Sequence, residues 1–257
     1  MAATLPDQPA NRRLEQLATW AGHATFANVN APRRVYIFDL DGTLVDSLPD
    51  IALHLRTVLV AHGLPAPTDA QTRGWVGSGA RELIVRAVTE LGHEVHADHV
   101  PAAALIAGVF DAFMAAYRGA PLIHTAMYPG LADQLDQLVR NPDNVLAILS
   151  NKPHDLTVTI TQQLLARWRF APVYGQRDGI AKKPDPTVAL QIASECGVGS
   201  ASCIFIGDSE VDIETGRAAG MRTVGVTWGI GDAVQLRASG PNVVIDNVAE
   251  LFGTLGS

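Results

Sequence analysis

The stretch Phe38-Asp39-Leu40-Asp41-Gly42-Thr43-Leu44-Val45-Asp46-Ser47 decides how this chain folds and what it does. It begins at the end of an apolar, β-prone run, Val35–Phe38, which predicts a buried strand. Asp39 and Asp41 stand directly after that strand, and Gly42 lets the backbone turn and come close to a ligand. One carboxylate can attack phosphorus and form an acyl phosphate, while a second can protonate the leaving oxygen and then deprotonate water. Taken alone, the motif also fits an Asx-type turn that caps a helix.

Apolar runs like the first recur along the chain and alternate with helical patterns. The further strand candidates are residues 145–149, 204–206, 223–226 and 243–245, and the helical patterns cover 131–139, 186–196 and 213–219. Strands that alternate with helices indicate a parallel sheet covered on both faces. The sequence therefore predicts an α/β protein with a Rossmann-like, doubly wound parallel sheet.

One long interval interrupts this alternation. Residues 49–127 show helical periodicity and little that resembles a strand. The simplest interpretation is an α-helical cap domain inserted between the first and second strands, with residues 34–48 and 128–257 forming the α/β core. Residues 1–33 are expected to be an N-terminal appendage that is partly ordered at best.

Composition limits the classes of protein that need to be considered. The chain has 257 residues, of which 47% are hydrophobic and 18% charged, as in an ordinary globular protein. Its net charge of −7 argues against general attraction to nucleic acid or to anionic membranes. Cys196 and Cys203 are the two cysteines, and they suit a reducing compartment. No signal-like start or membrane-length apolar stretch is visible, so we expect a cytoplasmic protein.

Two further segments place polar side chains near predicted strand ends. Ser150 follows the run 145–149, where its hydroxyl could bind a phosphoryl oxygen, although serine at such a place is also a common helix N-cap. Lys183 precedes Pro184, and its ammonium could neutralise charge on a transferring phosphoryl group. A solvated lysine before a helix is the competing interpretation. Each signal is weak by itself.

A fourth segment offers carboxylates for a metal ion. Asp208 ends the run 204–206, and Asp212 lies about one helical turn later, so both can face the same point. Oxygen ligands are those that Mg²⁺ prefers, although both residues would also suit a helix N-terminus. In open α/β sheets the carboxyl ends of the strands form the ligand-binding edge. A nucleophile, an acid/base, a hydroxyl, a cation and metal ligands at that edge together favour Mg²⁺-dependent phosphoryl transfer.

These segments resemble the four signature motifs of the haloacid dehalogenase superfamily of phosphohydrolases, and the similarity spans roughly residues 34–255. The first motif with a helical insert after it resembles the branch that carries a small α-helical cap. Further runs, among them Tyr128-Pro129-Gly130 and Ser150-Asn151-Lys152-Pro153, are similar to those of phosphoglycolate phosphatases. The resemblance therefore implies hydrolysis of a small phosphomonoester, with 2-phosphoglycolate favoured.

The resemblance also implies roles for individual residues. Asp39 would be phosphorylated, and Asp41 would act first as general acid and then as general base. Ser150 and Lys183 would hold the phosphoryl oxygens. Gly42, Thr43 and Asn151, which belong to the same motifs, are counted with them as phosphate-binding residues.

The same resemblance implies a metal site. Mg²⁺ would be bound by an oxygen of Asp39, the backbone carbonyl of Asp41 and the carboxylate of Asp208, with Asp212 acting through a water or from behind these ligands. Haloacid dehalogenases themselves lack the second acidic residue of the first motif, so the presence of Asp41 favours phosphoryl transfer.

Substrate choice depends on the cap. Arg81, in the loop 74–81, could pair with a substrate carboxylate, although a solvated arginine on a first helical turn is the more ordinary interpretation. The open alternatives are a sugar phosphate or nucleotide as substrate, a phosphomutase, and a non-catalytic phosphate-binding protein. The sequence is compatible with a monomer or a homodimer.

Overall fold

The computed structural model of the chain describes residues 33–95 and 103–255. These residues belong to one compact unit, Arg33–Ser257. The predicted appendage, residues 1–33, lies outside the described residues except for Arg33. No helix in the described ranges is both long enough and apolar enough to cross a membrane.

The core is a six-stranded sheet in which each pair of neighbouring strands is parallel. The strand order is β5-β4-β1-β6-β7-β8. The strands are β1 (Val35–Phe38), β4 (Val145–Pro153), β5 (Phe170–Gln176), β6 (Cys203–Gly207), β7 (Arg222–Val226) and β8 (Val243–Ile245). Numbered within this sheet alone, the order is 3-2-1-4-5-6, which is the Rossmann order. The predicted α/β, doubly wound fold is confirmed.

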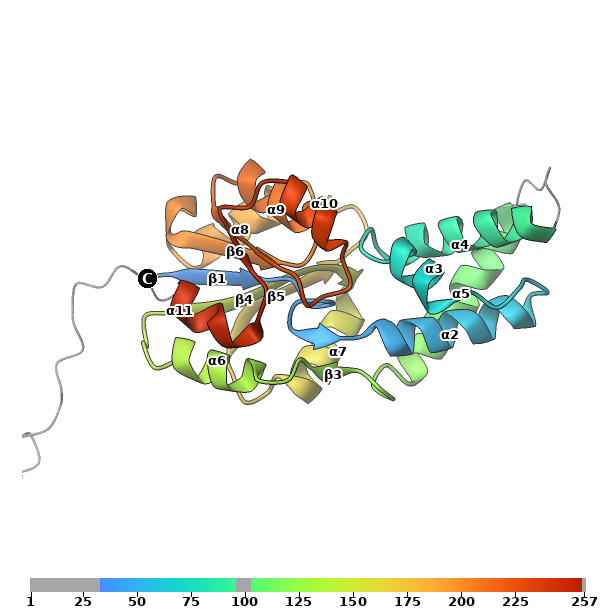
Figure 1. Cartoon of the computed structure of the whole chain (residues 1–257), viewed down its shortest axis with the longest axis horizontal. Helices are drawn as coiled ribbons and strands as arrows, with labels where there is room; N and C mark the ends of the chain where they lie inside the picture. Colours follow the sequence, from blue (N-terminus) through green and yellow to red (C-terminus); the bar gives the residue numbers. More distant parts are fainter. Residues whose placement is uncertain (1–32, 96–102, 256–257) are drawn as a thin grey trace, which may run out of the picture. The chain divides into compact units, whose positions relative to one another are not determined.

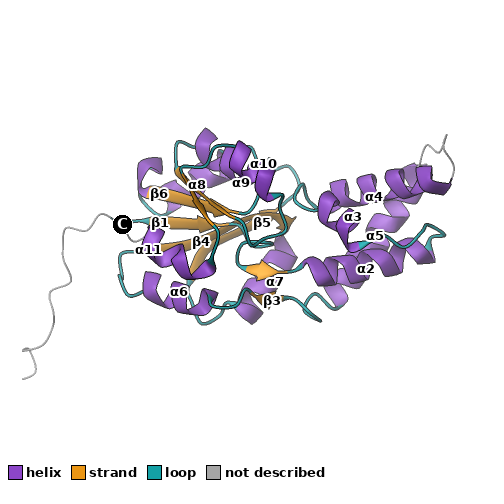
Figure 2. Ribbon diagram, viewed as in Figure 1, coloured by secondary structure: helices purple, strands orange, loops and turns teal. Residues whose placement is uncertain are grey.

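Helices cover both faces of the sheet because alternate strand residues point to opposite sides (Figures 1 and 2). Tyr36 and Phe38 pack with one group of helices, and Val35 and Ile37 face the other side. The first group is α6 (Leu131–Leu138), α7 (His154–Leu164) and α11 (Leu251–Leu255). The second is α8 (Thr187–Glu195), α9 (Glu210–Ala218) and α10 (Ala233–Ala238). Burial on both faces explains why β1 reads as a continuous apolar run.

The helical interval predicted from the sequence is present between two short strands. β2 (Val45–Asp46) pairs antiparallel with β3 (Ala126–Met127), and four helices lie between them in the chain. These are α2 (Leu48–Ala61), α3 (Asp69–Trp75), α4 (Ala80–Val95) and α5 (Ala103–Gly119). They bury an apolar cluster of their own, around Leu55, Ile84 and Phe113. This separate cluster is why we propose that residues 49–127 form a cap domain, whose limits stay a prediction.

Two features of the sheet differ from the sequence interpretation. β5 was not predicted, because its sequence carries Pro172 and its burial is uneven, as is typical of an edge strand. β4 runs on to Pro153, so Ser150 lies inside the strand rather than after it. The hydroxyl of Ser150 nevertheless accepts a hydrogen bond from the Lys152 amide at 3.2 Å, as serine does in a local turn.

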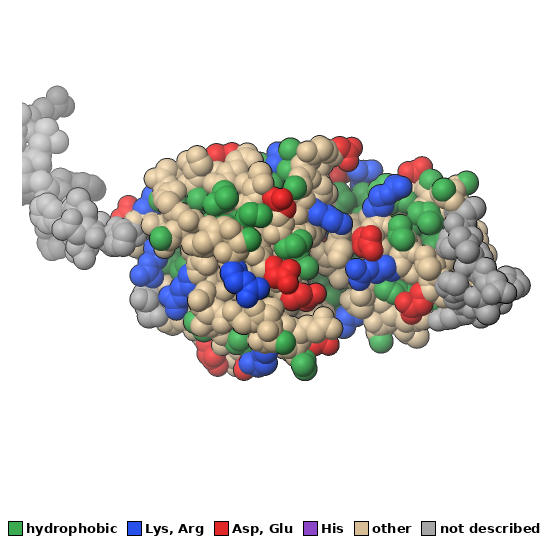
Figure 3. Space-filling view, turned by 90° about the horizontal axis from the view of Figure 1, so that it is seen from above, with side chains coloured by type: hydrophobic (Ala, Val, Ile, Leu, Met, Phe, Trp, Pro, Cys, Tyr) green, Lys and Arg blue, Asp and Glu red, His purple; other side chains and the backbone are tan. Residues whose placement is uncertain are grey.

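The outer surface carries mixed charge. Figure 3 shows acidic and basic side chains interspersed over one face of the molecule. This distribution agrees with the modest net charge of −7 and lacks the single-sign character of a general polyanion-binding surface on the face shown.

Asp50 joins the two chain segments that connect cap and core. It lies in the first turn of α2 and is fully buried. Its carboxylate accepts hydrogen bonds from the amides of residues 123, 124 and 125 and from the Thr125 hydroxyl, the last at 2.6 Å. Burial alone would raise the pKa of Asp50, but the bonds from Thr125, His124 and Ile123 outweigh it, so the pKa lies below its ordinary value. The entry and exit of the cap are thus tied by one carboxylate.

We expect Asp50→Asn to lower the free energy of unfolding by about 2–4 kcal/mol, because buried donors lose a charged acceptor. The matched control is Asp69→Asn, since Asp69 pairs with Arg56 at the surface, and such pairs contribute less than about 1 kcal/mol. Urea unfolding measures both. The pKa of Asp50 is lowered in the folded protein, so its contribution is present at neutral pH and is lost on acidification through that pKa. Equal effects of the two variants would contradict the clamp.

Candidate active site

Asp39 lies at the carboxyl end of β1, where the sheet changes its winding direction. Its backbone amide donates to the Ile206 carbonyl at 2.9 Å, which fixes it beside β6. The side chain is buried and lines a cavity of about 80 Å³ between the sheet edge and the helices of residues 49–127. This is the crevice at which ligands bind in folds of this order.

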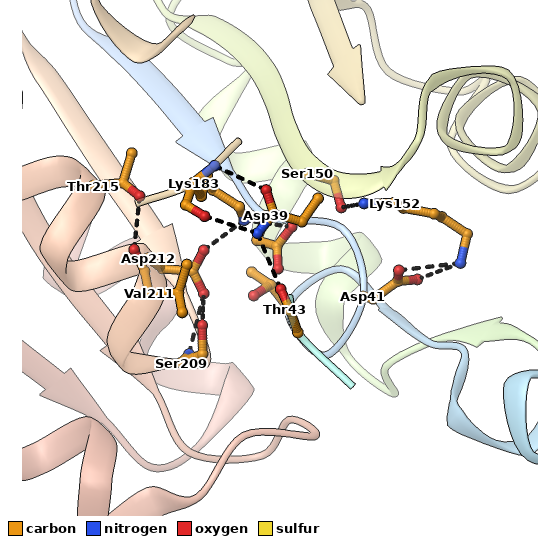
Figure 4. Close-up of polar contacts among 12 residues, drawn as sticks. Asp39, Asp41, Thr43, Ser150, Lys152, Lys183, Ser209, Val211, Asp212 and Thr215 are labelled. Carbon is orange, nitrogen blue, oxygen red and sulfur yellow. Dashed lines mark hydrogen bonds and ion pairs between the residues drawn. The ribbon is translucent and has the colours of Figure 1, made fainter. Parts of the chain in front are cut away.

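Lys183 reaches Asp39 from the loop before α8. Its Nζ lies 2.9 Å from Asp39 Oδ1 and 2.6 Å from Asp212 Oδ1 (Figure 4). Burial would lower the pKa of Lys183, but the two carboxylates outweigh it and raise the pKa above its ordinary value. The Lys183 backbone is held by Asn151, whose side chain accepts from the Lys183 amide at 2.9 Å and donates to its carbonyl at 3.1 Å. The ammonium is therefore charged and fixed.

Three buried aspartates gather beside this lysine. Asp39, Asp208 and Asp212 can each offer one oxygen within 4.8 Å of the others. Burial and the neighbouring carboxylates raise the pKa of Asp208 to about 8, and burial, opposed by Lys183, raises that of Asp39 to about 6. Oδ1 of Asp39 is buried and accepts no hydrogen bond within the described part of the chain. Crowded carboxylates with an unused oxygen are a donor set that fits a divalent cation such as Mg²⁺.

Asp212 and Asp208 are both held from a second side. Asp212 Oδ2 accepts from the amide and hydroxyl of Ser209, at 3.1 and 2.6 Å (Figure 4). Asp208 Oδ2 accepts from the amides of Ile230 and Gly231, at 2.7 and 2.9 Å. These donors orient the carboxylates and leave Asp208 Oδ1 to the cluster, apart from a long contact of 3.5 Å to a hydroxyl.

Asp41 faces away from this cluster, toward a second lysine. Both of its oxygens accept from Lys152 Nζ, at 3.0 and 3.1 Å, and Oδ1 also accepts from Ser47 Oγ at 2.6 Å. Lys152 donates in turn to the hydroxyl of Tyr117 in α5, at 2.6 Å. Sequence reasoning missed Lys152 and Tyr117 because a lysine after an apolar run and a tyrosine in a helix give no local signal of contact with an aspartate.

Gly42 and Thr43 support Asp208 and do not line the cavity. A Cβ on Gly42 would lie 2.0 Å from Asp208 Oδ2, and the residue has φ of +86°, so only glycine fits. Thr43 donates its hydroxyl toward Asp208 Oδ1. Both residues were predicted to bind phosphate, and the structure instead places them behind the acidic cluster.

We expect Gly42→Ala to lower kcat/KM by at least about 100-fold, since displacing an active-site group by an ångström costs that much. Gly63→Ala is the matched control, because Gly63 has a similar φ of +78° but open space around its Cβ position. Both variants should lose about 1–2 kcal/mol of stability from the left-handed backbone. Only Gly42→Ala should lose turnover, and similar turnover losses in both would contradict this assignment.

The remaining predicted residues divide into two groups. Ser150 and Asn151 line the cavity, but the Asn151 side chain is engaged with the Lys183 backbone and the Gly77 carbonyl. Arg81 was predicted to face the substrate. Instead it is exposed on α4, its guanidinium lies 6.0 Å above the Phe110 ring, and it is not among the cavity-lining residues.

Comparisons with known proteins agree with this geometry. A model of the haloacid dehalogenase-like hydrolase family matches residues 36–226. Phosphoglycolate phosphatase 1 of Pseudomonas aeruginosa is 32% identical over 85% of this chain and 78% of its own length. The phosphoglycolate phosphatase of Pectobacterium atrosepticum is 32% identical over 85% of this chain and 91% of its length. A crystal structure described as a predicted phosphoglycolate phosphatase from Haemophilus somnus superposes with a TM-score of 0.80, at 26% identity, covering 86% and 97% of the chains.

The chain belongs to the haloacid dehalogenase-like hydrolase family. The sequence-based prediction of this family, and with it of a phosphoric monoester hydrolase, is confirmed.

Proposed function

We propose that the protein hydrolyses small phosphomonoesters through a phosphorylated Asp39, with 2-phosphoglycolate as the favoured substrate. The observation that carries the proposal is the placement of Asp39, which lines a small cavity with Lys183 on one side and Asp41 within the same cavity. The names of the bacterial relatives support the choice of substrate.

The first half-reaction uses Asp39 and Asp41. A carboxylate oxygen of Asp39 attacks phosphorus, and the bond from phosphorus to the leaving oxygen breaks. Asp41 gives a proton to that oxygen, so the alcohol leaves neutral. The fixed ammonium of Lys183 offsets the repulsion between the anionic nucleophile and the anionic phosphate. The Ser150 hydroxyl, buried in the cavity wall, would donate to a phosphoryl oxygen.

The second half-reaction restores the enzyme. A water attacks the phosphorus of the acyl phosphate and gives its proton to Asp41, and the bond to Asp39 breaks to release inorganic phosphate. Asp41 then carries the proton needed for the next turnover. Tyr117 and the apolar side chains that line the cavity opposite Asp39 restrict the access of other water molecules.

Mg²⁺ would be held by Asp39, the Asp41 carbonyl and Asp208, with Asp212 behind them. When bound, it would supply positive charge that stabilises the ionised carboxylates and the transferring phosphoryl group. Asp212 is already shared by Lys183 and Ser209, which favours an indirect role for it. The support for a divalent cation is the unused Asp39 oxygen beside two further buried carboxylates.

We further propose that the protein works in the cytoplasm as a monomer or homodimer. Cys196 and Cys203 are buried and unpaired in a disulfide, which suits a reducing compartment.

A panel of esters tests the proposed function. The value of kcat/KM with Mg²⁺ is measured for 2-phosphoglycolate, a hexose phosphate, a nucleoside monophosphate and a generic aryl phosphate. We expect 2-phosphoglycolate to rank first, because the small cavity disfavours a large leaving group. If it ranks no higher than the aryl ester, the substrate assignment is wrong, and if none is hydrolysed the phosphatase assignment is wrong.

A further inference from the structure

Lys152 is a buried cation that phosphate chemistry leaves without a stated role. The chain contains three lysines, and two of them, Lys152 and Lys183, line the cavity. Their side chains are only 2% and 3% exposed. Lys183 stands with Asp39 and Asp212, where the phosphoryl group would bind. Lys152 stands on the other side, with Asp41, where the leaving group would lie.

The wall on the leaving-group side offers little else to an anion. The cavity-lining residues from the helical interval are Ile51, Val76, Gly77, Gly79, Ala80, Leu83, Phe113 and Tyr117. Apart from backbone groups, the polar group among these is the Tyr117 hydroxyl. A carboxylate buried against apolar side chains is costly unless it is paired and hydrogen-bonded. A carboxylate-bearing leaving group in this cavity therefore needs the Lys152–Tyr117 pair.

Other nearby cations are committed elsewhere. Arg73 donates to the carbonyls of Gly229 and Ile230, each at 2.9 Å. Lys182 is exposed and donates to the Ser78 carbonyl at 2.8 Å. Arg81 lies outside the cavity. Among the described residues that line the cavity, the cationic side chains are Lys152 and Lys183 alone.

The geometry of Lys152 allows it to accept a further partner. Its ammonium has three hydrogens, which are directed to the two Asp41 oxygens and to Tyr117. The Tyr117 oxygen accepts one of these bonds, so its own O–H can donate to another acceptor. An incoming carboxylate can bind this hydroxyl and compete with one Asp41 oxygen for Lys152. That exchange frees the Asp41 oxygen to approach the leaving oxygen.

We propose that Lys152 and the Tyr117 hydroxyl form the subsite for a carboxylate on the leaving group of the substrate. The inference rests on the proposed phosphatase function and deepens it, because it assigns the preference for 2-phosphoglycolate to one side chain of β4 and one of α5. The subsite exists only where the helical interval and the sheet edge meet, so it also couples substrate choice to the placement of the general acid/base.

The test compares two esters that differ only in the group at issue. Values of kcat/KM are measured for 2-phosphoglycolate and for 2-hydroxyethyl phosphate, in which a hydroxymethyl group replaces the carboxylate. The wild type, Lys152→Met and Tyr117→Phe are compared, and Lys182→Met is the matched control because it removes the third lysine, outside the cavity. Folding of each variant is checked by circular dichroism.

The wild type should prefer 2-phosphoglycolate. Lys152→Met should lower kcat/KM for both esters, since Asp41 loses its partner, and should lower it about 10- to 100-fold further for 2-phosphoglycolate, the size of a lost charged hydrogen bond. Tyr117→Phe should erode the same preference by roughly 3- to 10-fold, the size of a neutral one. Lys182→Met should keep the wild-type ratio.

Three results would overturn the inference in distinguishable ways. Equal losses for both esters in Lys152→Met, with the ratio also unchanged in Tyr117→Phe, would show that Lys152 only positions Asp41. If Lys152→Met does not fold, an unchanged ratio in Tyr117→Phe alone overturns the subsite, because that variant keeps the Lys152–Asp41 pair. A wild type that hydrolyses neither ester would remove the proposed function and the subsite together.

Discussion

Asp39→Asn is expected to lower kcat for every phosphomonoester by roughly 10⁴- to 10⁶-fold, which is the range for removal of a covalent nucleophile. The amide cannot form an acyl phosphate, yet it keeps the size and place of the carboxylate beside Lys183. Phosphate release is measured with Mg²⁺ in excess. Acid-quenched wild-type enzyme should also carry phosphate on the peptide that contains Asp39, and the variant should not.

The control for this prediction is Asp185→Asn. Asp185 is an exposed aspartate near Lys183 in the chain, and its carboxylate accepts from the Thr187 amide rather than facing the cavity. It should retain wild-type turnover. Substantial turnover by Asp39→Asn, or label on a peptide other than that of Asp39, would show that the nucleophile lies elsewhere.

The residues that sequence reasoning identified correctly are those whose position depends on one strand end. Asp39 and Asp208 follow buried, β-prone runs, and parallel strands bring their carboxyl ends to one edge, so pattern and topology together place them side by side. The same reasoning did not find β5, because its edge position relaxes the apolar pattern and tolerates Pro172. Its neighbour β4 was found because it is buried on both faces.

The residues that sequence reasoning misplaced depend on contacts between the helical interval and the core. Lys152 and Tyr117 are 35 positions apart, and their contact exists only because α5 lies over the end of β4. Arg81 begins α4, and the phase of that helix decides whether its side chain faces the cavity or Phe110. A motif states which residue types are present. It does not state the rotation of a helix about its axis or how two segments dock.

Gly42 and Asn151 show a related limit. Both belong to motifs that the sequence associates with phosphate, and both act on a neighbour instead. Gly42 gives Asp208 room, and Asn151 fixes the Lys183 backbone. Sequence reasoning found the right segments and assigned the wrong contacts, because a residue beside a catalytic group supports it as often as it touches the substrate.

The second large effect is expected from Asp208→Asn, in metal binding and in stability. Loss of groups that only orient metal ligands costs 10- to 100-fold in affinity, so loss of a direct ligand should weaken Mg²⁺ binding by at least about 100-fold. Activity at low Mg²⁺ should fall with it. The matched control is again Asp185→Asn, an exposed aspartate that should change neither quantity.

The same variant has a signature that does not depend on turnover. Burial and the carboxylates of Asp212 and Asp39 raise the pKa of Asp208 in the folded protein from 3.8 to about 8. A raised pKa means that the folded, metal-free protein binds this proton more tightly than the unfolded chain does. The free energy of unfolding of metal-free wild type should therefore lose a contribution as pH rises from about 4 to about 8. Bound Mg²⁺ stabilises the ionised form, so the rise in melting temperature on adding Mg²⁺ should grow over the same pH interval.

Asp208→Asn removes the buried charge, so its metal-free melting temperature should exceed that of metal-free wild type near pH 8 and should vary less with pH. Added Mg²⁺ should raise the melting temperature of the wild type and of Asp185→Asn, but not that of Asp208→Asn. Scanning calorimetry at several pH values, with EDTA or with Mg²⁺, measures all of these differences. A Mg²⁺-dependent shift that survives in Asp208→Asn would mean that the cation binds away from the cluster of Asp39, Asp208 and Asp212, because that cluster without Asp208 has lost the carboxylate with the most strongly raised pKa of the three.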